Sequence, residues 1–215
     1  MRSLLLSCLI FSGSLLEGQV IDEGTFSIRQ AGREIGREDF SIRPGRQGVP
    51  TGSTVTSRVR LPAVNPRFTQ ESVLERKGDG SFANLVVTYS SRESSGRVIA
   101  EVSRNVLRIH SASGGSEGIR ELAAPANLIG LEDSAFALYA LVPDMATQDG
   151  GQLTGFFPRS GLRRNFTVRR ESNGQEGTRI VMAGELAGTI WLDGAGHLIR
   201  IEFPESNLEI VRLPK

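Results

Sequence analysis

One segment near the middle of the chain constrains the fold more than any other. Residues 131–144 (LEDSAFALYALVPD) carry apolar side chains at helical spacing, and the aromatic and alanine residues extend this apolar surface almost all round. A helix without a polar face must be buried. Asp133 or Ser134 is expected to cap its first turn, and Pro143 is expected to end it. We therefore predict a buried helix near residues 131–142, enclosed by the rest of the chain.

The remaining segments are typical of short strands. Apolar and polar residues alternate at 26–28 and 40–42, on either side of a turn at 31–32, and similar runs continue to residue 213. Residues 111–118 (SASGGSEG) predict a flexible loop. The fold class expected is mainly β: a single antiparallel curled sheet or incomplete barrel, built as a meander, that encloses one apolar α-helix.

The first 18 residues differ from the rest of the chain. Arg2 precedes the apolar run LLLSCLIF at residues 4–11, and small residues follow it. This order is typical of a secretory signal peptide, with cleavage expected near Gly18 or, as a second choice, Ser14. The apolar run is shorter than the roughly 20 residues of a spanning helix. An uncleaved anchor and a buried N-terminal helix are the alternatives.

The position of the single cysteine helps to predict the cellular compartment of the protein. Cys8 lies inside the leader, so the mature protein would have neither a disulfide nor a thiol nucleophile; lipidation at this residue is a further alternative. An exported protein of this size without disulfides depends on its core, which fits a bacterial envelope. We expect a signal peptide at 1–18 and a single β-rich domain at 19–215, periplasmic or envelope-associated in a Gram-negative-type bacterium.

The charge balance argues against one class of partner. The chain has 25 basic and 24 acidic residues, a formal net charge of +1, and removing the leader takes away one residue of each sign. No overall field would therefore attract nucleic acid. No transmembrane helix is expected in the mature chain.

Two stretches resemble a known group of proteins. They are GTFSIRQAGREIGREDFSIR at residues 24–43 and TIWLDGAGHLIRIEFPESNLEIVRL at 189–213. Together they resemble uncharacterised exported bacterial domains related to LolA and LolB. In that superfamily an incomplete antiparallel barrel curls around helical lid elements, and LolA and LolB carry acylated lipoproteins in an apolar cavity. The carriers have several lid helices, whereas only one is expected here, so lipoprotein transport itself does not carry over.

The apolar positions also provide candidate ligand contacts. If one helix with small alanines does not fill the curled sheet, a cavity remains inside it. The candidate lining residues are Phe136, Tyr139, Ala140, Phe82, Tyr89, Trp191 and Phe203. A strip of arginines and phenylalanines at 156–170 could contact an anionic headgroup or a partner through Arg159, Arg163 and Arg164. Ordinary outward arginines on strands are the alternative interpretation.

Catalytic and metal sites are not expected. Residues 114–118 (GGSEG) match the G-x-S-x-G pattern around Ser116, and His197 follows, but that nucleophile needs a strand, a sharp turn and a helix on a parallel sheet. The two histidines, His110 and His197, have no other ligand at a metal-binding spacing. We expect neither catalytic residues nor a metal or cofactor.

The function expected is binding of an apolar or acyl-chain ligand, either a lipid or a lipidated partner, in a half-barrel cavity. Burial of hydrocarbon would contribute about 0.8 kcal/mol per methylene. One alternative is a structural or interaction module of the envelope, with a fully packed core and a protein partner. A Ser hydrolase is the remaining alternative.

Overall fold

The computed structural model describes residues 20–45, 51–63, 68–172 and 177–214. Within these residues, fifteen strands form one unclosed sheet in the order β8-β7-β6-β5-β4-β3-β2-β1-β15-β14-β13-β12-β11-β10-β9. Neighbouring strands are antiparallel except β9 and β10. The expected fold class, a mainly β curled meander around one apolar helical segment, is confirmed. The predicted leader at 1–18 lies outside the described residues.

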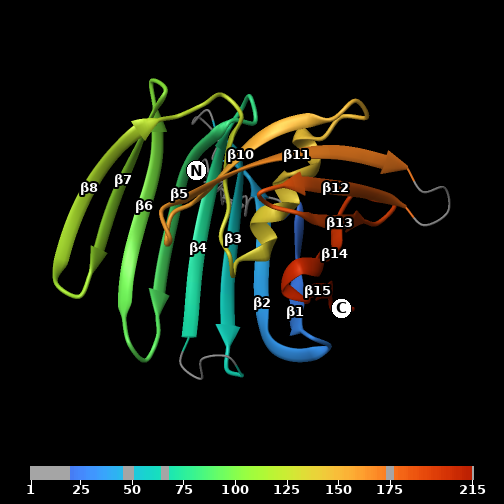
Figure 1. Cartoon of the computed structure of the whole chain (residues 1–215), viewed down its shortest axis with the longest axis horizontal. Helices are drawn as coiled ribbons and strands as arrows, with labels where there is room; N and C mark the ends of the chain where they lie inside the picture. The colour runs from blue at the N-terminus through green and yellow to red at the C-terminus, as the bar shows by residue number, and fades with distance from the viewer. Residues whose placement is uncertain (1–19, 46–50, 64–67, 173–176, 215) are drawn as a thin grey trace, which may run out of the picture.

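The sheet is built from two meanders (Figure 1). The N-terminal meander consists of β1 (Asp22–Gln30), β2 (Arg33–Pro44), β3 (Thr51–Leu61), β4 (Phe68–Lys77), β5 (Phe82–Ser90), β6 (Ser95–Ser103), β7 (Val106–Ser113) and β8 (Ser116–Ala123). The C-terminal meander consists of β9 (Leu128–Gly130), β10 (Gly151–Phe157), β11 (Leu162–Ser172), β12 (Thr178–Gly184), β13 (Gly188–Leu192), β14 (Leu198–Phe203) and β15 (Leu208–Arg212).

The two meanders join where the first strand pairs with the last. Ile28 of β1 lies opposite Ile210 of β15, and both are buried. Beside them, Arg212 donates two hydrogen bonds to the carboxylate of Asp22, at 2.6 and 2.9 Å. The stretches 24–43 and 189–213 are therefore adjacent in the sheet.

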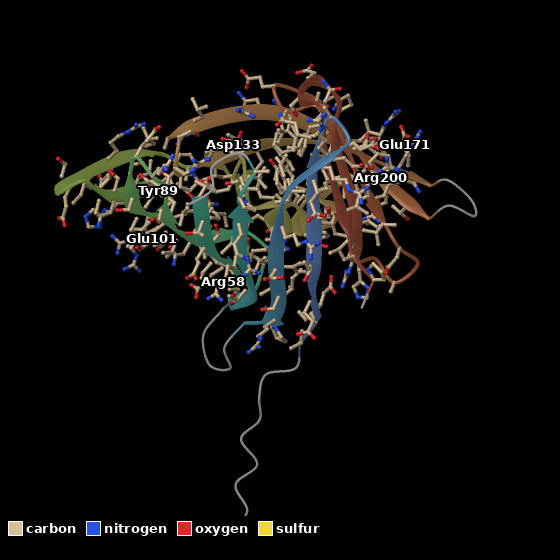
Figure 2. The ribbon with its side chains drawn as sticks, turned by 90° about the horizontal axis from the view of Figure 1, so that it is seen from below. Arg58, Tyr89, Glu101, Asp133, Glu171 and Arg200 are labelled. Atoms are coloured by element: carbon tan, nitrogen blue, oxygen red, sulfur yellow. The ribbon has the colours of Figure 1, made fainter. Side chains whose placement is uncertain are left out.

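One face of the sheet forms the core. Alternate residues of the central strands, such as Phe40, Val55 and Leu85, point inward and are buried, as period-2 patterning requires. Charged residues such as Arg58, Glu101 and Arg200 lie along the outer surface (Figure 2). Figure 1 shows the coiled yellow segment between the two groups of strands, where η1 (Phe136–Leu141) contacts β2, β3 and β14.

The helical segment differs from the prediction in type and in its first residue. It consists of two short 3₁₀ helices, η1 and η2 (Pro143–Met145), rather than an α-helix that begins at Leu131. The reason lies in the sheet: the Leu131 N–H donates to the carbonyl of Phe156, and the backbone is still extended at Ala135. Pro143 begins η2 because its missing N–H costs nothing in a first turn.

One further local prediction needs correction. The predicted flexible loop at 111–118 is instead a hairpin between β7 and β8, because Gly114 and Gly115 adopt φ of 58° and 83° and let Ser113 pair with Ser116. Residues 128–130 form the short buried strand β9, which precedes the helical segment. Among the described helices, none is long and apolar enough to cross a membrane.

Candidate functional site

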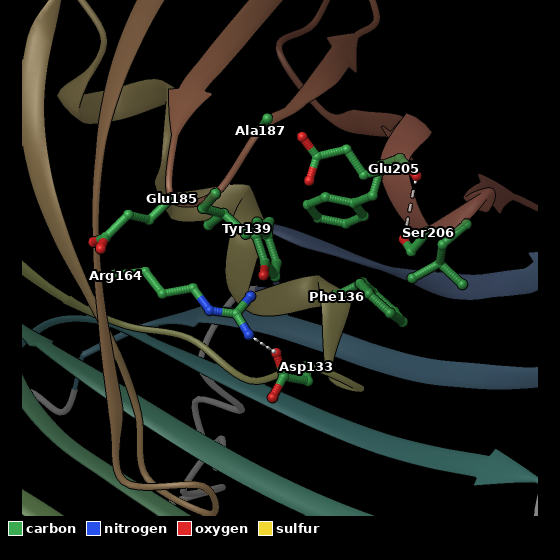
Figure 3. Close-up of a pocket in the computed structure, with 11 residues that line it drawn as sticks. Asp133, Phe136, Tyr139, Arg164, Glu185, Ala187, Glu205 and Ser206 are labelled. Atoms are coloured by element: carbon green, nitrogen blue, oxygen red, sulfur yellow. Dashed lines mark hydrogen bonds and ion pairs between the residues drawn. The ribbon is translucent and has the colours of Figure 1, made fainter.

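A pocket of about 380 Å³ lies beside η1 (Figure 3). The end of β14, the turn η4 (Pro204–Ser206) and the turn between β12 and β13 surround it. Its volume falls within the range of about 300–1,000 Å³ that is usual for small-molecule sites. The pocket is therefore large enough for a ligand, and its lining indicates which kind.

Three aromatic rings, Phe136, Tyr139 and Phe203, form one side of the pocket and are called the aromatic floor here. The centroids lie 6.2 Å apart for Phe136 and Tyr139, 6.3 Å for Phe136 and Phe203, and 5.5 Å for Tyr139 and Phe203. Two rings come from η1 and the third from the end of β14, so the curl of the sheet brings them together. All three were among the candidate ligand contacts predicted from the sequence.

The Tyr139 hydroxyl is the unusual atom of the aromatic floor. The residue is only 2% exposed, and its hydroxyl has no hydrogen-bond partner among the described residues. Burial raises the pKa of Tyr139 well above its usual range, so the hydroxyl keeps its proton. Figure 3 shows it directed toward the side of the pocket where Arg164 lies. The hydroxyl is therefore a polar group of the pocket lining that makes no hydrogen bond to another described residue.

Charged side chains border the aromatic floor. Asp133 pairs with Arg164 at 3.6 Å, and the Arg164 guanidinium also lies 4.8 Å from the centroid of the Phe157 ring. Glu185, just after β12, accepts the Asn165 backbone N–H. Glu205 lies in η4. Asp133, Glu185 and Glu205 all line the pocket and are called the acidic rim.

A buried carboxylate holds η1 in place under the pocket. Glu38 of β2 is 0% exposed and accepts the backbone N–H groups of Phe136 and Ala137 at 2.8 and 2.9 Å. The Ser57 hydroxyl also donates to it, at 2.6 Å. Burial raises the pKa of Glu38 from its ordinary value of 4.5 to about 7, and these three hydrogen bonds oppose the shift. Glu38 therefore caps η1 in place of the predicted Asp133 or Ser134.

The predicted cap residue Ser134 has another partner. Its hydroxyl donates to the Gln70 side-chain oxygen at 3.0 Å, and the Gln70 amide donates to Ser72 at 3.1 Å. Sequence reasoning missed this buried polar group and Glu38. The alternating pattern of β2 could have predicted that Glu38 is buried, because Glu38 shares its strand face with the apolar residues Phe40 and Ile42.

A second buried carboxylate lies at the start of the same segment. Glu132 is 0% exposed and accepts the Arg159 backbone N–H at 2.9 Å and its Nε at 3.4 Å. Burial raises the pKa of Glu132 to about 6, while the hydrogen bond and the positive charge of Arg159 oppose the shift. Glu132 thus ties the chain before η1 to the turn after β10.

Four predicted ligand contacts lie away from this pocket. Phe82 borders a void of only about 10 Å³, about the space of a single water. Ala140 is half-buried, and Tyr89 lies near the end of β5. Trp191 lies under the Arg200 guanidinium, 5.2 Å from its ring centroid. The void beside Phe82 is thus too small for a ligand, and none of these four residues lines the pocket beside η1.

Two of the three predicted headgroup arginines have partners elsewhere. Arg159 contacts Glu132 and lies 5.3 Å from the Phe68 ring centroid. Arg163 donates to the Ala123 carbonyl at 2.6 Å. Only Arg164 lines the pocket.

The serine and histidine pattern is not assembled into one site. Ser116 begins β8, an edge strand, whereas His197 lies in the turn between β13 and β14, with Nδ1 3.2 Å from Asp193. Within the described residues, no group of three or more His, Cys, Asp or Glu side chains could hold a metal ion.

Comparisons with known proteins add little to this picture. No protein-family model and no curated protein matches the chain. Among solved structures, a DUF1089 family protein from Pseudomonas aeruginosa is similar over 96% of this chain and 98% of that chain, with 11% identity and a TM-score of 0.41.

Proposed function

We propose that this protein binds an apolar or acyl-chain ligand, either a free lipid or the lipid of a lipidated partner, in the pocket beside η1. The observation that carries the proposal is the aromatic floor, together with the Tyr139 hydroxyl, which belongs to the pocket lining and makes no hydrogen bond to another described residue. Leu186 and Leu208 extend the apolar lining. Asp133, Arg164, Glu185 and Glu205 border this apolar lining. Apolar and aromatic side chains with a small number of polar groups are the usual composition of a small-molecule site.

The proposal includes the cell envelope as the place of action. The leader pattern at 1–18 supports export, and the absence of a cysteine after Cys8 is consistent with a bacterial periplasm. Kinship with LolA- and LolB-related domains is also part of the proposal, supported by the curled sheet and by the adjacency of its first and last strands. N-terminal sequencing of protein from an envelope extract would test export, and a retained leader would count against cleavage.

Binding is tested by titrating the purified protein with a fluorescent acyl-chain probe. Ala187, a pocket-lining residue between β12 and β13, can be replaced by a large side chain that occupies the pocket. Ala187→Trp is expected to abolish probe uptake. Ala195→Trp, at an exposed turn position away from the pocket, is the matched control and should bind as the natural protein does.

Two results would overturn the proposal. One is a natural protein that takes up no acyl-chain probe and carries no lipid in a native mass spectrum. The other is equal uptake by the Ala187→Trp and Ala195→Trp variants. The first would favour a scaffold whose core is already filled, in agreement with the tight packing around Phe82.

A further inference from the structure

The side chains around the pocket carry an excess of negative charge, and this excess restricts which head group a ligand can have. The acidic rim supplies three carboxylates, Asp133, Glu185 and Glu205, whereas Arg164 supplies the one guanidinium in the described lining. Electrostatic complementarity between a site and its ligand acts mainly on specificity. A ligand with an anionic head would face an excess of like charge.

Arg164 is not available as an isolated cation. It pairs with Asp133 at 3.6 Å and lies over the Phe157 ring. An anionic head that recruited Arg164 would leave Asp133 without this partner. By contrast, Glu205 has no hydrogen-bond or ion-pair partner within the part of the chain that the structure describes, so its carboxylate is ready to receive a cation.

The aromatic floor also favours a cationic head group, independently of the acidic rim. A phenol oxygen can accept a hydrogen bond from an N–H donor, and the side chain of Tyr139, a residue that is 2% exposed, makes no hydrogen bond to another described residue. The faces of aromatic rings such as Phe136 and Phe203 attract cations. An ammonium group therefore meets favourable contacts at the floor and at the rim.

We propose that the pocket selects an amphiphile with a protonated amine as its head, with the hydrocarbon on the aromatic floor and the ammonium group between the Tyr139 hydroxyl and the acidic rim. This inference rests on the proposed binding function and deepens it. An acidic head held by Arg159, Arg163 and Arg164 is the competing expectation from the sequence.

The test compares three probes with the same chain and different heads: decylammonium, decanoate and decanol. Isothermal titration calorimetry on the natural protein at low ionic strength should show decylammonium binding about tenfold more tightly than decanoate, with decanol between them. Added salt should reduce this preference, because the rim is open to solvent and its charges are screened.

Substitutions distinguish the contribution of charge to probe binding from that of apolar contact. Glu205→Gln should reduce the preference for decylammonium about threefold and leave decanol binding unchanged, since a single charge exposed to solvent has a modest effect on binding. Glu93→Gln, at an exposed turn outside the pocket, is the matched control and should change nothing. Tyr139→Phe should weaken decylammonium more than decanol.

The results of these titrations distinguish a failure of the charge preference from a failure of the proposed binding function. Binding of decanoate as tight as that of decylammonium overturns the charge preference and leaves the apolar site standing. An unchanged preference in Glu205→Gln likewise overturns the role of the rim. Failure of all three probes to bind overturns the proposed function itself.

Discussion

The carboxylate of Glu38 accepts the backbone N–H of Phe136 at 2.8 Å, across 98 residues of chain. Glu38→Ala would leave this N–H and that of Ala137 buried without an acceptor, at about 1–3 kcal/mol for each group. We expect urea unfolding to show a loss of about 2–5 kcal/mol in the free energy of unfolding. Glu38→Gln retains one acceptor oxygen and should lose less. Equal stability of the alanine variant and the natural protein would contradict the capping role.

The same carboxylate makes stability depend on pH. Burial raises the pKa of Glu38 to about 7, so between its ordinary value of 4.5 and about 7 the folded protein holds a proton that the unfolded chain has released. Its contribution to stability is therefore full below this window and falls as pH rises through it. Glu132, whose pKa burial raises to about 6, acts in the same direction.

Comparison with Glu38→Gln isolates this effect, because glutamine does not titrate. From about pH 5 to about pH 8 the natural protein should lose on the order of 1–3 kcal/mol more than the variant, at about 1.4 kcal/mol for each unit of pKa shift. The measurement is urea unfolding of both proteins across this range. Parallel curves would show that Glu38 is ionised throughout.

The ion pair between Asp22 and Arg212 stabilises the junction of the two meanders, where β1 pairs with β15. Its side chains are 8% and 16% exposed, and its two hydrogen bonds match the planar guanidinium. Arg212→Lys should cost about 1 kcal/mol, because an ammonium cannot reproduce the double contact. Arg212→Met should cost about 3 kcal/mol, because it leaves Asp22 unpaired. Chemical denaturation checks both values, and adding Asp22→Asn to Arg212→Met should recover part of the loss.

Gly36 is required where β2 passes β3. A Cβ at this position would lie 2.2 Å from the Arg60 carbonyl oxygen, which belongs to the backbone and cannot easily move. Gly36→Ala should therefore lower the melting temperature and cost about 3 kcal/mol. Gly78→Ala is the matched control, because nothing lies within 4 Å of its Cβ. A harmless Gly36→Ala substitution would show that the two strands can separate there.

The Tyr139 hydroxyl should contribute almost nothing to stability, because it has no partner among the described residues. Tyr139→Phe is expected to change the free energy of unfolding by less than about 0.5 kcal/mol. Phe203→Ala, which removes a ring of the same floor, should cost about 3–5 kcal/mol. A large loss in Tyr139→Phe, measured by urea unfolding without ligand, would show that the hydroxyl is bonded within the protein.

Local patterning was sufficient to predict much of the sheet. Alternation around residues 26–28 and 40–42 identified the first hairpin, which is β1 and β2, and its turn lies at Ala31 and Gly32 as expected. The apolar segment also indicated that Phe136 and Tyr139 are buried. These features depend on neighbours in the chain, so a short window of sequence contains the needed information.

Other features depend on partners far along the chain. The cap of η1 comes from Glu38, and propensity alone favoured the nearer Asp133 and Ser134. The strand β9 exists because all three of its residues pair with β10. Likewise, the partners of Arg159 and Arg163 are set by the curl of the sheet, which no local pattern describes.

The joint between β1 and β15 has a kinetic consequence. Each meander consists of neighbours in sequence, whereas this one strand pair brings together residues such as Asp22 and Arg212, 190 positions apart. Contacts of such long range carry the largest loop-closure cost and slow folding. During synthesis, β1 has to wait for the last strand of the chain to emerge. We expect pulsed hydrogen exchange to show β1 and β15 protected last, so that the sheet is completed only after β15 has been synthesised.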